Sequence, residues 1–262
     1  MDFWEIYAAA VVGVFALIFG SFLNCAAMRI AKDEDFIHGR SRCPLCGHEL
    51  GALELIPVIS FVFLKGRCKH CGKAISVRYP LSETAFLILT EILYFRFGLG
   101  AVFIRDVVLT GALFTASLVD IACMRIPDGC LLIGLAAWTL SIPFMGYDLR
   151  QCIIFAASGA GCMAFMLIMA LLVERATGKE ALGGGDVKLF ALLGLYLGPM
   201  GAYWLVLLSS IIGLAMAGFT RLINVRPKGA AMPFGPAICL AGYLLVLFGQ
   251  DLSAWYINTF LG

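Results

Sequence analysis

Charged residues are scarce in this sequence. They make up 14% of its 262 residues, whereas hydrophobic residues make up 61%, and an ordinary soluble domain carries roughly 25% charged residues. This composition excludes a soluble globular protein. Long runs without charge recur along the chain, and several reach the roughly 20 residues that a helix needs to cross a bilayer. We therefore predict an all-α fold, a polytopic transmembrane helix bundle, because backbone groups in lipid must bond internally.

No basic residue precedes the first hydrophobic run, which follows Asp2 and Glu5. A cleaved secretory signal begins with a basic region, so we predict a retained helix here. About eight helices are expected in all, and Gly198 and Pro199 separate the sixth from the seventh. The expected helices span residues 6–28, 79–97, 102–121, 128–147, 151–173, 186–198, 201–220 and 234–252.

Basic residues are rare on one side of the membrane in this arrangement. With the N-terminus outside, 16 of the 19 lysines and arginines lie on the inner side. Because lysine and arginine favour cytoplasmic loops, both termini are predicted to lie outside. The chain then divides into a first transmembrane helix at 1–28, a polar cytoplasmic loop at 29–78 and a transmembrane core at 79–262.

Two CxxC motifs lie in the polar loop, 21 residues apart. Each motif offers two thiolates beside a tight turn, and a glycine, Gly47 or Gly72, follows it. Two such motifs together supply the four ligands of a tetrahedral zinc ion. The predicted structural zinc site consists of Cys43, Cys46, Cys68 and Cys71.

Other interpretations of this loop stay open. The motifs could be a redox pair or free cysteines, although a cytoplasmic location argues against a permanent disulfide. His48 and His70 lie beside the motifs and could replace a ligand, but we expect them to be bystanders. The apolar segment 53–66 is too short to span the membrane. It is either a hairpin on the membrane surface or the packed core of the zinc module.

Acidic residues within membrane segments are costly, so each one is a candidate functional residue. Asp120, Asp128 and Asp186 are all predicted near the cytoplasmic face, each at the end of a helix. Glu83 and Glu91, in the second helix, fit a structural role and a functional role equally well. The carboxylates near the predicted outer helix ends are expected to be solvated: Asp106, Asp148 and Asp251.

Histidine is missing from the predicted helices, because all three histidines lie in the polar loop. A serine or cysteine nucleophile in the membrane core therefore has no histidine base. Two neighbouring carboxylates cannot both ionise easily, so one holds a proton while the other can activate water. The neutral partner can donate to the developing oxyanion of a peptide carbonyl. Peptide hydrolysis by an aspartyl pair is thus the predicted chemistry.

Three glycines, Gly183, Gly184 and Gly185, precede Asp186. They let the backbone approach an extended peptide closely, so that a substrate could even add as a strand. As a phosphate-binding loop the triplet is weak, since no GK[ST] follows it. Lys188, two residues further on, either binds a substrate group or reaches the membrane interface.

Several stretches, in this order, resemble those of the bacterial type IV prepilin peptidases, which are polytopic GxGD aspartyl proteases. The stretches are GSFLNCAAMRI, CPLCGHEL, CKHCGKAISVRYPLSE, the aspartate at 120 with RIPD after it, GGGDVKL and MPFGPAI. The resemblance implies that Asp120 and Asp186 form the catalytic pair, and we expect Asp128 to support it. It also matches the four loop cysteines to those of the family.

The resemblance implies cleavage of the basic leader of type IV prepilins or type II secretion pseudopilins after a glycine, on the cytoplasmic side of the bacterial inner membrane. It also implies methylation of the new N-terminal amine with S-adenosylmethionine, although no residue identifies the site of that cofactor. The expected partners are this substrate and the lipid bilayer, with no nucleic acid, and the sequence leaves the oligomeric state open.

Two other classes of protein remain as alternatives. A carboxylate-dependent membrane transporter would favour acidic residues near the bilayer midplane. A zinc-module scaffold of a secretion complex would need the polar loop and not the aspartates.

Overall fold

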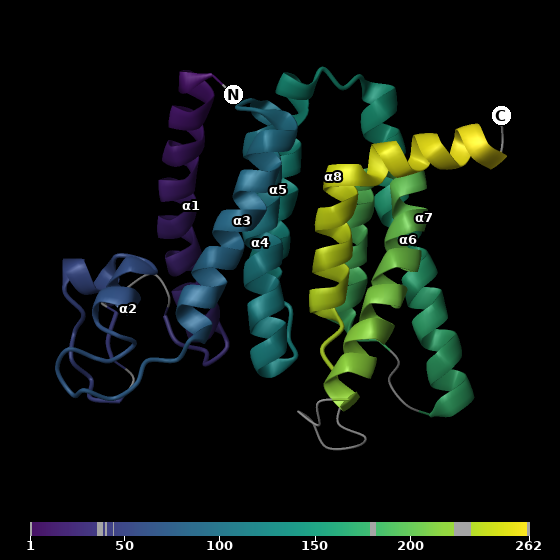
Figure 1. The fold of residues 1–262 in the computed structure, drawn as a ribbon. Coiled ribbons are helices and arrows are strands. Elements are labelled where there is room, and N and C mark those ends of the chain that lie inside the picture. Colours follow the sequence, from purple (N-terminus) through teal and green to yellow (C-terminus); the bar gives the residue numbers. More distant parts are fainter. Residues whose placement is uncertain are drawn as a thin grey trace. The chain divides into compact units, whose positions relative to one another are not determined.

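The structure is a computed structural model, and it describes residues 2–35, 39, 41–43, 45–178, 182–222 and 232–260. The regular secondary structure of the described residues consists of helices, apart from two isolated β-bridges in the polar loop. This confirms the predicted all-α fold class (Figure 1). The elements are α1 (Phe3–Ile30), η1 (Ala52–Leu55, a 3-10 helix), α2 (Ile59–Phe63), α3 (Arg78–Phe97), α4 (Ala101–Cys123), α5 (Asp128–Met145), α6 (Leu149–Thr177), α7 (Gly184–Leu222) and α8 (Gly235–Phe260). Six of these helices are long and apolar enough to span a membrane.

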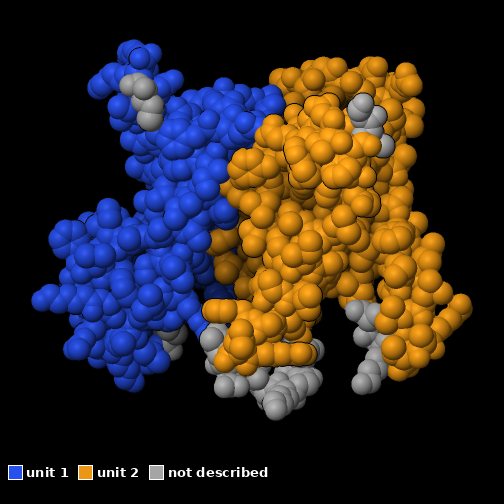
Figure 2. Space-filling model, turned by 45° about the vertical axis from the view of Figure 1, so that its right-hand side comes forward, with its two compact units in different colours: residues 1–103 blue, residues 104–262 orange. Residues whose placement is uncertain are grey.

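The chain forms two compact units, residues 1–103 and 104–262 (Figure 2). In the first unit α1 packs along α3, and a side chain on Gly20 would lie only 3.1 Å from the Cβ of Phe86. The first unit also holds the loop with the two CxxC motifs. The functional division predicted from the sequence, with a zinc loop at 29–78 and a core at 79–262, stays a prediction, since a compact unit need not coincide with a functional one.

The second unit is built around α7, which packs against α6 and α8. Glycines allow this close packing: a Cβ on Gly159 of α6 would lie 2.7 Å from the carbonyl oxygen of Ala191. Likewise, a Cβ on Gly242 of α8 would lie 2.6 Å from Leu193. Helices in lipid associate through close van der Waals packing, because the hydrophobic effect does not distinguish lipid from a neighbouring helix.

Gly198 divides α7 into two halves, because its backbone is not helical (φ 70°, ψ −173°). Phe234 shows how the halves are arranged, since its ring packs on Phe190 of the first half at 6.3 Å and faces Gly213 of the second half. The two halves therefore run side by side, as Figure 1 also shows. The predicted break between the sixth and seventh helices is confirmed, although the sixth begins at Gly184 rather than at residue 186.

The burial of Asp106 contradicts one prediction from the sequence. It was predicted to be solvated near an outer helix end, but it is fully buried in α4. Its carboxylate is bound by Arg105 through two hydrogen bonds, of 2.7 and 3.1 Å. Arg105 also donates to Tyr147 and lies over the ring of Tyr196. The pair is buried because a neutralised, fully hydrogen-bonded ion pair is tolerated inside a bundle. Asp148 and Asp251 are exposed.

The close contact of α6 and α7 can be tested with two alanine substitutions in one helix. Gly159→Ala places a methyl group against the backbone of α7 and should lower the free energy of unfolding by about 1–3 kcal/mol. Gly161→Ala is the matched control, because no atom lies within 4 Å of its added Cβ; it should be neutral or slightly stabilising. Thermal unfolding in detergent measures both variants, and equal melting temperatures would contradict the packing described.

Candidate active site

Asp120 lies in the last turn of α4, and 5% of its surface is exposed. Its Oδ2 atom accepts a hydrogen bond of 2.9 Å from the backbone N–H of Gly235, the first residue of α8. A helix N-terminus offers such unpaired N–H groups and favours negative charge. The start of α8 therefore holds the Asp120 carboxylate in position.

A side chain at position 235 would displace the Asp120 carboxylate. A Cβ there would lie 2.6 Å from Oδ2 of Asp120, which is closer than real Cβ contacts. The sequence analysis quoted Gly235 within MPFGPAI but assigned it no role. The sequence could not reveal this role, because the contact joins residues 115 positions apart. The one available signal was the position of Gly235 before Pro236, where a helix begins.

Asp186 is the third residue of α7. The backbone N–H of Gly183 donates to its carboxylate, and the N–H of Asp186 donates to the carbonyl oxygen of Gly183 at 3.0 Å. The bond from Gly183 to the carboxylate is the half of a capping box in which the side chain at N3 accepts from the N–H of the N-cap residue. Of the other two glycines, Gly185 packs closely, since its Cβ would lie 3.0 Å from Ile126, whereas Gly184 faces open space.

The two aspartates that the sequence predicted as a pair lie near each other. They lie close enough for the charge of Asp120 to act on the carboxyl of Asp186. Both also act on the thiol of Cys239, which is buried in α8. The site is thus assembled where the end of α4, the start of α7 and the first turns of α8 meet, within the second compact unit. Such an arrangement of two carboxylates can share a proton and activate water.

Asp128 and Lys188 bind each other rather than the pair. The Nζ atom of Lys188 lies 2.7 Å from Oδ1 of Asp128, and both side chains are more than half exposed. This ion pair joins the first turn of α5 to the first turn of α7. An exposed ion pair contributes little to stability, at most about 1 kcal/mol. The ion pair therefore matters for its position close to Asp186 rather than for its contribution to stability.

The four cysteines of the polar loop form a cluster in the first unit. Their Sγ atoms all lie within 4.8 Å of one another, as the ligands of one metal ion require. Both CxxC motifs fold alike: the N–H of Gly47 donates to Cys43, and that of Gly72 donates to Cys68, each at 2.9 Å. Both glycines have a positive φ, 72° and 66°, so the predicted turns are present. This donor set could hold a metal ion.

The two thiols of the first motif differ in pKa. The backbone N–H of Leu45 lowers the pKa of the Cys43 thiol to about 7, whereas burial and the neighbouring thiols raise the pKa of the Cys46 thiol to about 11. The rings of His48 and His70 stack on each other with centroids 3.5 Å apart. The cluster found in the described residues consists of cysteines alone, which agrees with the expectation that the histidines are bystanders.

Comparison with known proteins shows to which family the chain belongs. A family model for the bacterial peptidase A24 N-terminal domain matches residues 14–97, and a model for the type IV leader peptidase family matches residues 107–218. A protein of Bacillus subtilis (strain 168) named prepilin leader peptidase/N-methyltransferase is 34% identical over 97% of this chain and 99% of its own length. The chain belongs to the type IV leader peptidase family.

Further relatives of this leader peptidase family member carry the same name. The protein of Aeromonas salmonicida (strain A449) is 31% identical over 96% of this chain and 94% of its own length. That of Pseudomonas aeruginosa is 30% identical over 92% of this chain and 91% of its own length. The two family models meet between residues 97 and 107, where the two compact units also divide. No solved structure matches the chain significantly.

The metal site can be tested by measuring the metal content of the purified protein. We expect about one zinc ion per chain, and Cys68→Ser should weaken its binding about tenfold or more, because one thiolate ligand is lost. Cys152→Ser is the control, since Cys152 belongs to α6 and is not a member of the cluster. Mass spectrometry of the metals left after competition with a chelator measures both, and a Cys68→Ser protein that holds its metal as tightly as the wild type would exclude this site.

Proposed function

We propose that this protein is an aspartyl endopeptidase that cleaves the basic leader of type IV prepilins or type II secretion pseudopilins after a glycine, and that it works at the cytoplasmic face of the bacterial inner membrane. The observation that carries the proposal is the meeting of Asp120 and Asp186. Their helices begin or end at this point, and the family to which the chain belongs is a peptidase family.

In the proposed reaction the paired carboxyls share one proton. The ionised carboxylate takes a proton from a water molecule, which attacks the scissile carbonyl carbon. The neutral carboxyl donates to the developing oxyanion. Collapse of the tetrahedral intermediate breaks the C–N bond, and the leaving nitrogen takes up a proton. Each carboxylate is held by the backbone N–H of a glycine, Gly235 or Gly183, so the pair is oriented before substrate binds.

Residues beside the pair have supporting roles in this proposal. The Lys188–Asp128 ion pair ties the start of α7 to α5, which fixes the position of Asp186. Open space at Gly184 leaves room for an extended peptide next to the carboxylate. The absence of a side chain at Gly184 lets a substrate strand approach the backbone there.

The membrane face follows from the distribution of basic residues. With both termini outside, 16 of 19 lysines and arginines lie inside, and the cysteine cluster is then cytoplasmic. We propose that the cluster binds a structural zinc ion, since four thiolates are typical zinc ligands. In a reducing compartment these thiols stay available for the metal.

We further propose that the protein methylates the amine exposed by cleavage, as the name of its relatives indicates for them. The cofactor implied is S-adenosylmethionine, which would supply the methyl group transferred to the amine.

The peptidase proposal predicts the effect of removing either carboxylate. Asp120→Asn and Asp186→Asn should each lower the cleavage rate by at least about 1000-fold, because an amide can neither take nor supply the proton. The measurement is cleavage of a purified prepilin in detergent or lipid, with sequencing of the N-terminus of the product. Asp148→Asn is the matched control, since this exposed residue caps α6 and asparagine caps equally well.

Cleavage at the wild-type rate by either variant of the pair would show that the pair is not catalytic. If the protein were a transporter or a scaffold instead, even the wild type would show no cleavage. Circular dichroism of each variant shows whether it is folded.

A second prediction concerns the glycine beside the pair. Gly235→Ala should lower cleavage by about tenfold or more, because its methyl group must displace the Asp120 carboxylate. Gly218→Ala serves as the control, since its Cβ meets nothing within 4 Å. The same cleavage assay measures both variants, and equal rates would show that the contact between Gly235 and Asp120 does not position the pair.

A further inference from the structure

Apolar side chains of the polar loop are exposed mainly on η1 and α2, which contact each other. Within the described part of residues 29–78, eight large hydrophobic side chains are exposed, and six of them lie between residues 53 and 63. Val62 and Phe63 are 67% and 82% exposed, more than Phe15 on the outside of α1, which is 58% exposed. We call these six residues the η1–α2 surface: Leu53, Leu55, Ile56, Ile59, Val62 and Phe63.

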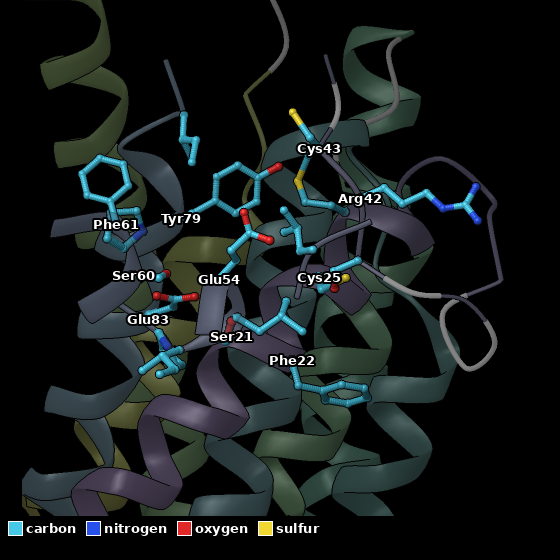
Figure 3. Close-up of a pocket in the computed structure, with 18 of the residues that line it drawn as sticks. Ser21, Phe22, Cys25, Arg42, Cys43, Glu54, Ser60, Phe61, Tyr79 and Glu83 are labelled. Atoms are coloured by element: carbon cyan, nitrogen blue, oxygen red, sulfur yellow. The ribbon is translucent and has the colours of Figure 1, made fainter. Parts of the chain in front are cut away.

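The exposed residues of α2 share one face of this short helix. Ile59, Val62 and Phe63 follow one another at the i, i+3, i+4 spacing that places side chains on the same side. Phe61 and Leu64 instead line a cavity within the first unit, and Figure 3 shows Phe61 there. The inner face of α2 is thus covered by the protein. A helix that is apolar on both faces is normally buried on both, so the outer face needs a cover from outside the described residues.

A hydrogen bond holds α2 at a defined depth relative to α3. The N–H of Val58, just before α2, donates to Oε2 of Glu83 at 2.8 Å, and Glu83 is buried. Glu83 lies five residues after Arg78, where α3 begins, or about 8 Å along the helix axis. The 20 residues of α3 extend about 30 Å, the thickness of the hydrocarbon core. The start of α2 therefore lies near the boundary between hydrocarbon and headgroups, and Figure 1 shows α2 at the level of the lower end of α1.

The chain that follows α2 is basic. Between Glu54 and Glu83 there is no acidic residue, and five basic residues are exposed: Lys65, Arg67, Lys69, Lys73 and Arg78. The other charges of the loop all precede this stretch, with basic residues at 29, 32, 40 and 42 and acidic residues at 33, 34, 35, 49 and 54. Basic residues next to a membrane are attracted to anionic headgroups. The stretch after the η1–α2 surface has the charge that such headgroups require.

We propose that the η1–α2 surface inserts into the membrane leaflet beside it, and that the basic residues after it bind anionic headgroups. In the proposed topology this is the cytoplasmic leaflet. Short apolar segments flanked by lysine and arginine bind membranes in this way. A second copy of the chain fits less well, because two basic stretches would face each other, and the proposed substrate fits less well because its leader is also basic. The inference does not depend on the paired aspartates.

A photoreactive residue at position 63 identifies what covers the surface. The full-length protein carries p-benzoylphenylalanine in place of Phe63, which keeps an aromatic side chain at this exposed position. It is irradiated in nanodiscs of phosphatidylethanolamine and phosphatidylglycerol, with purified prepilin added. Mass spectrometry of the tryptic peptide 43–65 then measures the products. We expect adducts with the mass of a phospholipid.

The same photoreactive residue at position 49 is the matched control. Glu49 belongs to the same tryptic peptide but lies outside the surface. Its ion pair with Arg42 is partly exposed, so its loss costs little stability. This position should give at least about fivefold less phospholipid adduct, because only the inserted face reaches the acyl chains. Circular dichroism and metal content show whether each variant is folded.

The lipid charge tests the basic stretch separately. Replacing both residues, Lys65→Gln and Arg67→Gln, should lower the adduct at position 63 about threefold or more in these anionic nanodiscs. In nanodiscs of phosphatidylcholine the double variant and the parent protein should give equal yields. Equal yields in the anionic nanodiscs as well would overturn the role given to the basic residues.

Other products would assign the surface to another partner. A cross-link between two copies of the chain, or to the added prepilin, without a phospholipid adduct would show a protein-docking surface and overturn the proposal. Position 63 reacting with lipid no more than position 49 would overturn it too, since the surface would then face water.

Discussion

A carboxylate buried in this bundle can find a partner only within the protein, because lipid offers none. The kind of partner decides what the carboxylate can do. Asp106 is held by a guanidinium through two hydrogen bonds, so its charge is neutralised and its oxygens are occupied. Asp120 receives a backbone N–H at the start of α8, which supplies a dipole and no proton. Asp106 is thus part of the framework, whereas the hydrogen bond from Gly235 orients Asp120 without adding a positive charge.

Close helix packing brings the aspartates together. Asp186 stands at the start of α7, and α7 approaches α6 and α8 closely because Gly159 and Gly242 carry no side chains. The reversal at Gly198 lets both halves of α7 reach the first turns of α8. The geometry of the pair is therefore set by contacts along the whole length of these helices, far from the carboxylates themselves.

The sequence predicted the helices well, since the membrane requires long apolar runs and Gly198-Pro199 breaks one of them. It also predicted Asp120 and Asp186 at the same end of the bundle, because the positive-inside rule indicates which helix ends face the cytoplasm. It failed at Asp106, whose neighbour Arg105 is adjacent in the chain but whose burial depends on distant helices. The roles of Gly235 and Glu83 were equally hidden, because each depends on a contact between segments well separated in the sequence.

The cysteine cluster also constrains the chain between its two motifs. The two CxxC motifs stand at either end of the segment that contains η1 and α2, so a metal ion bound to all four thiols would close this segment into a loop. Closing a flexible loop of this length costs about 3 kcal/mol of chain entropy. Metal binding during folding would offset that cost, so that η1 and α2 would be ordered by an ion that touches no substrate.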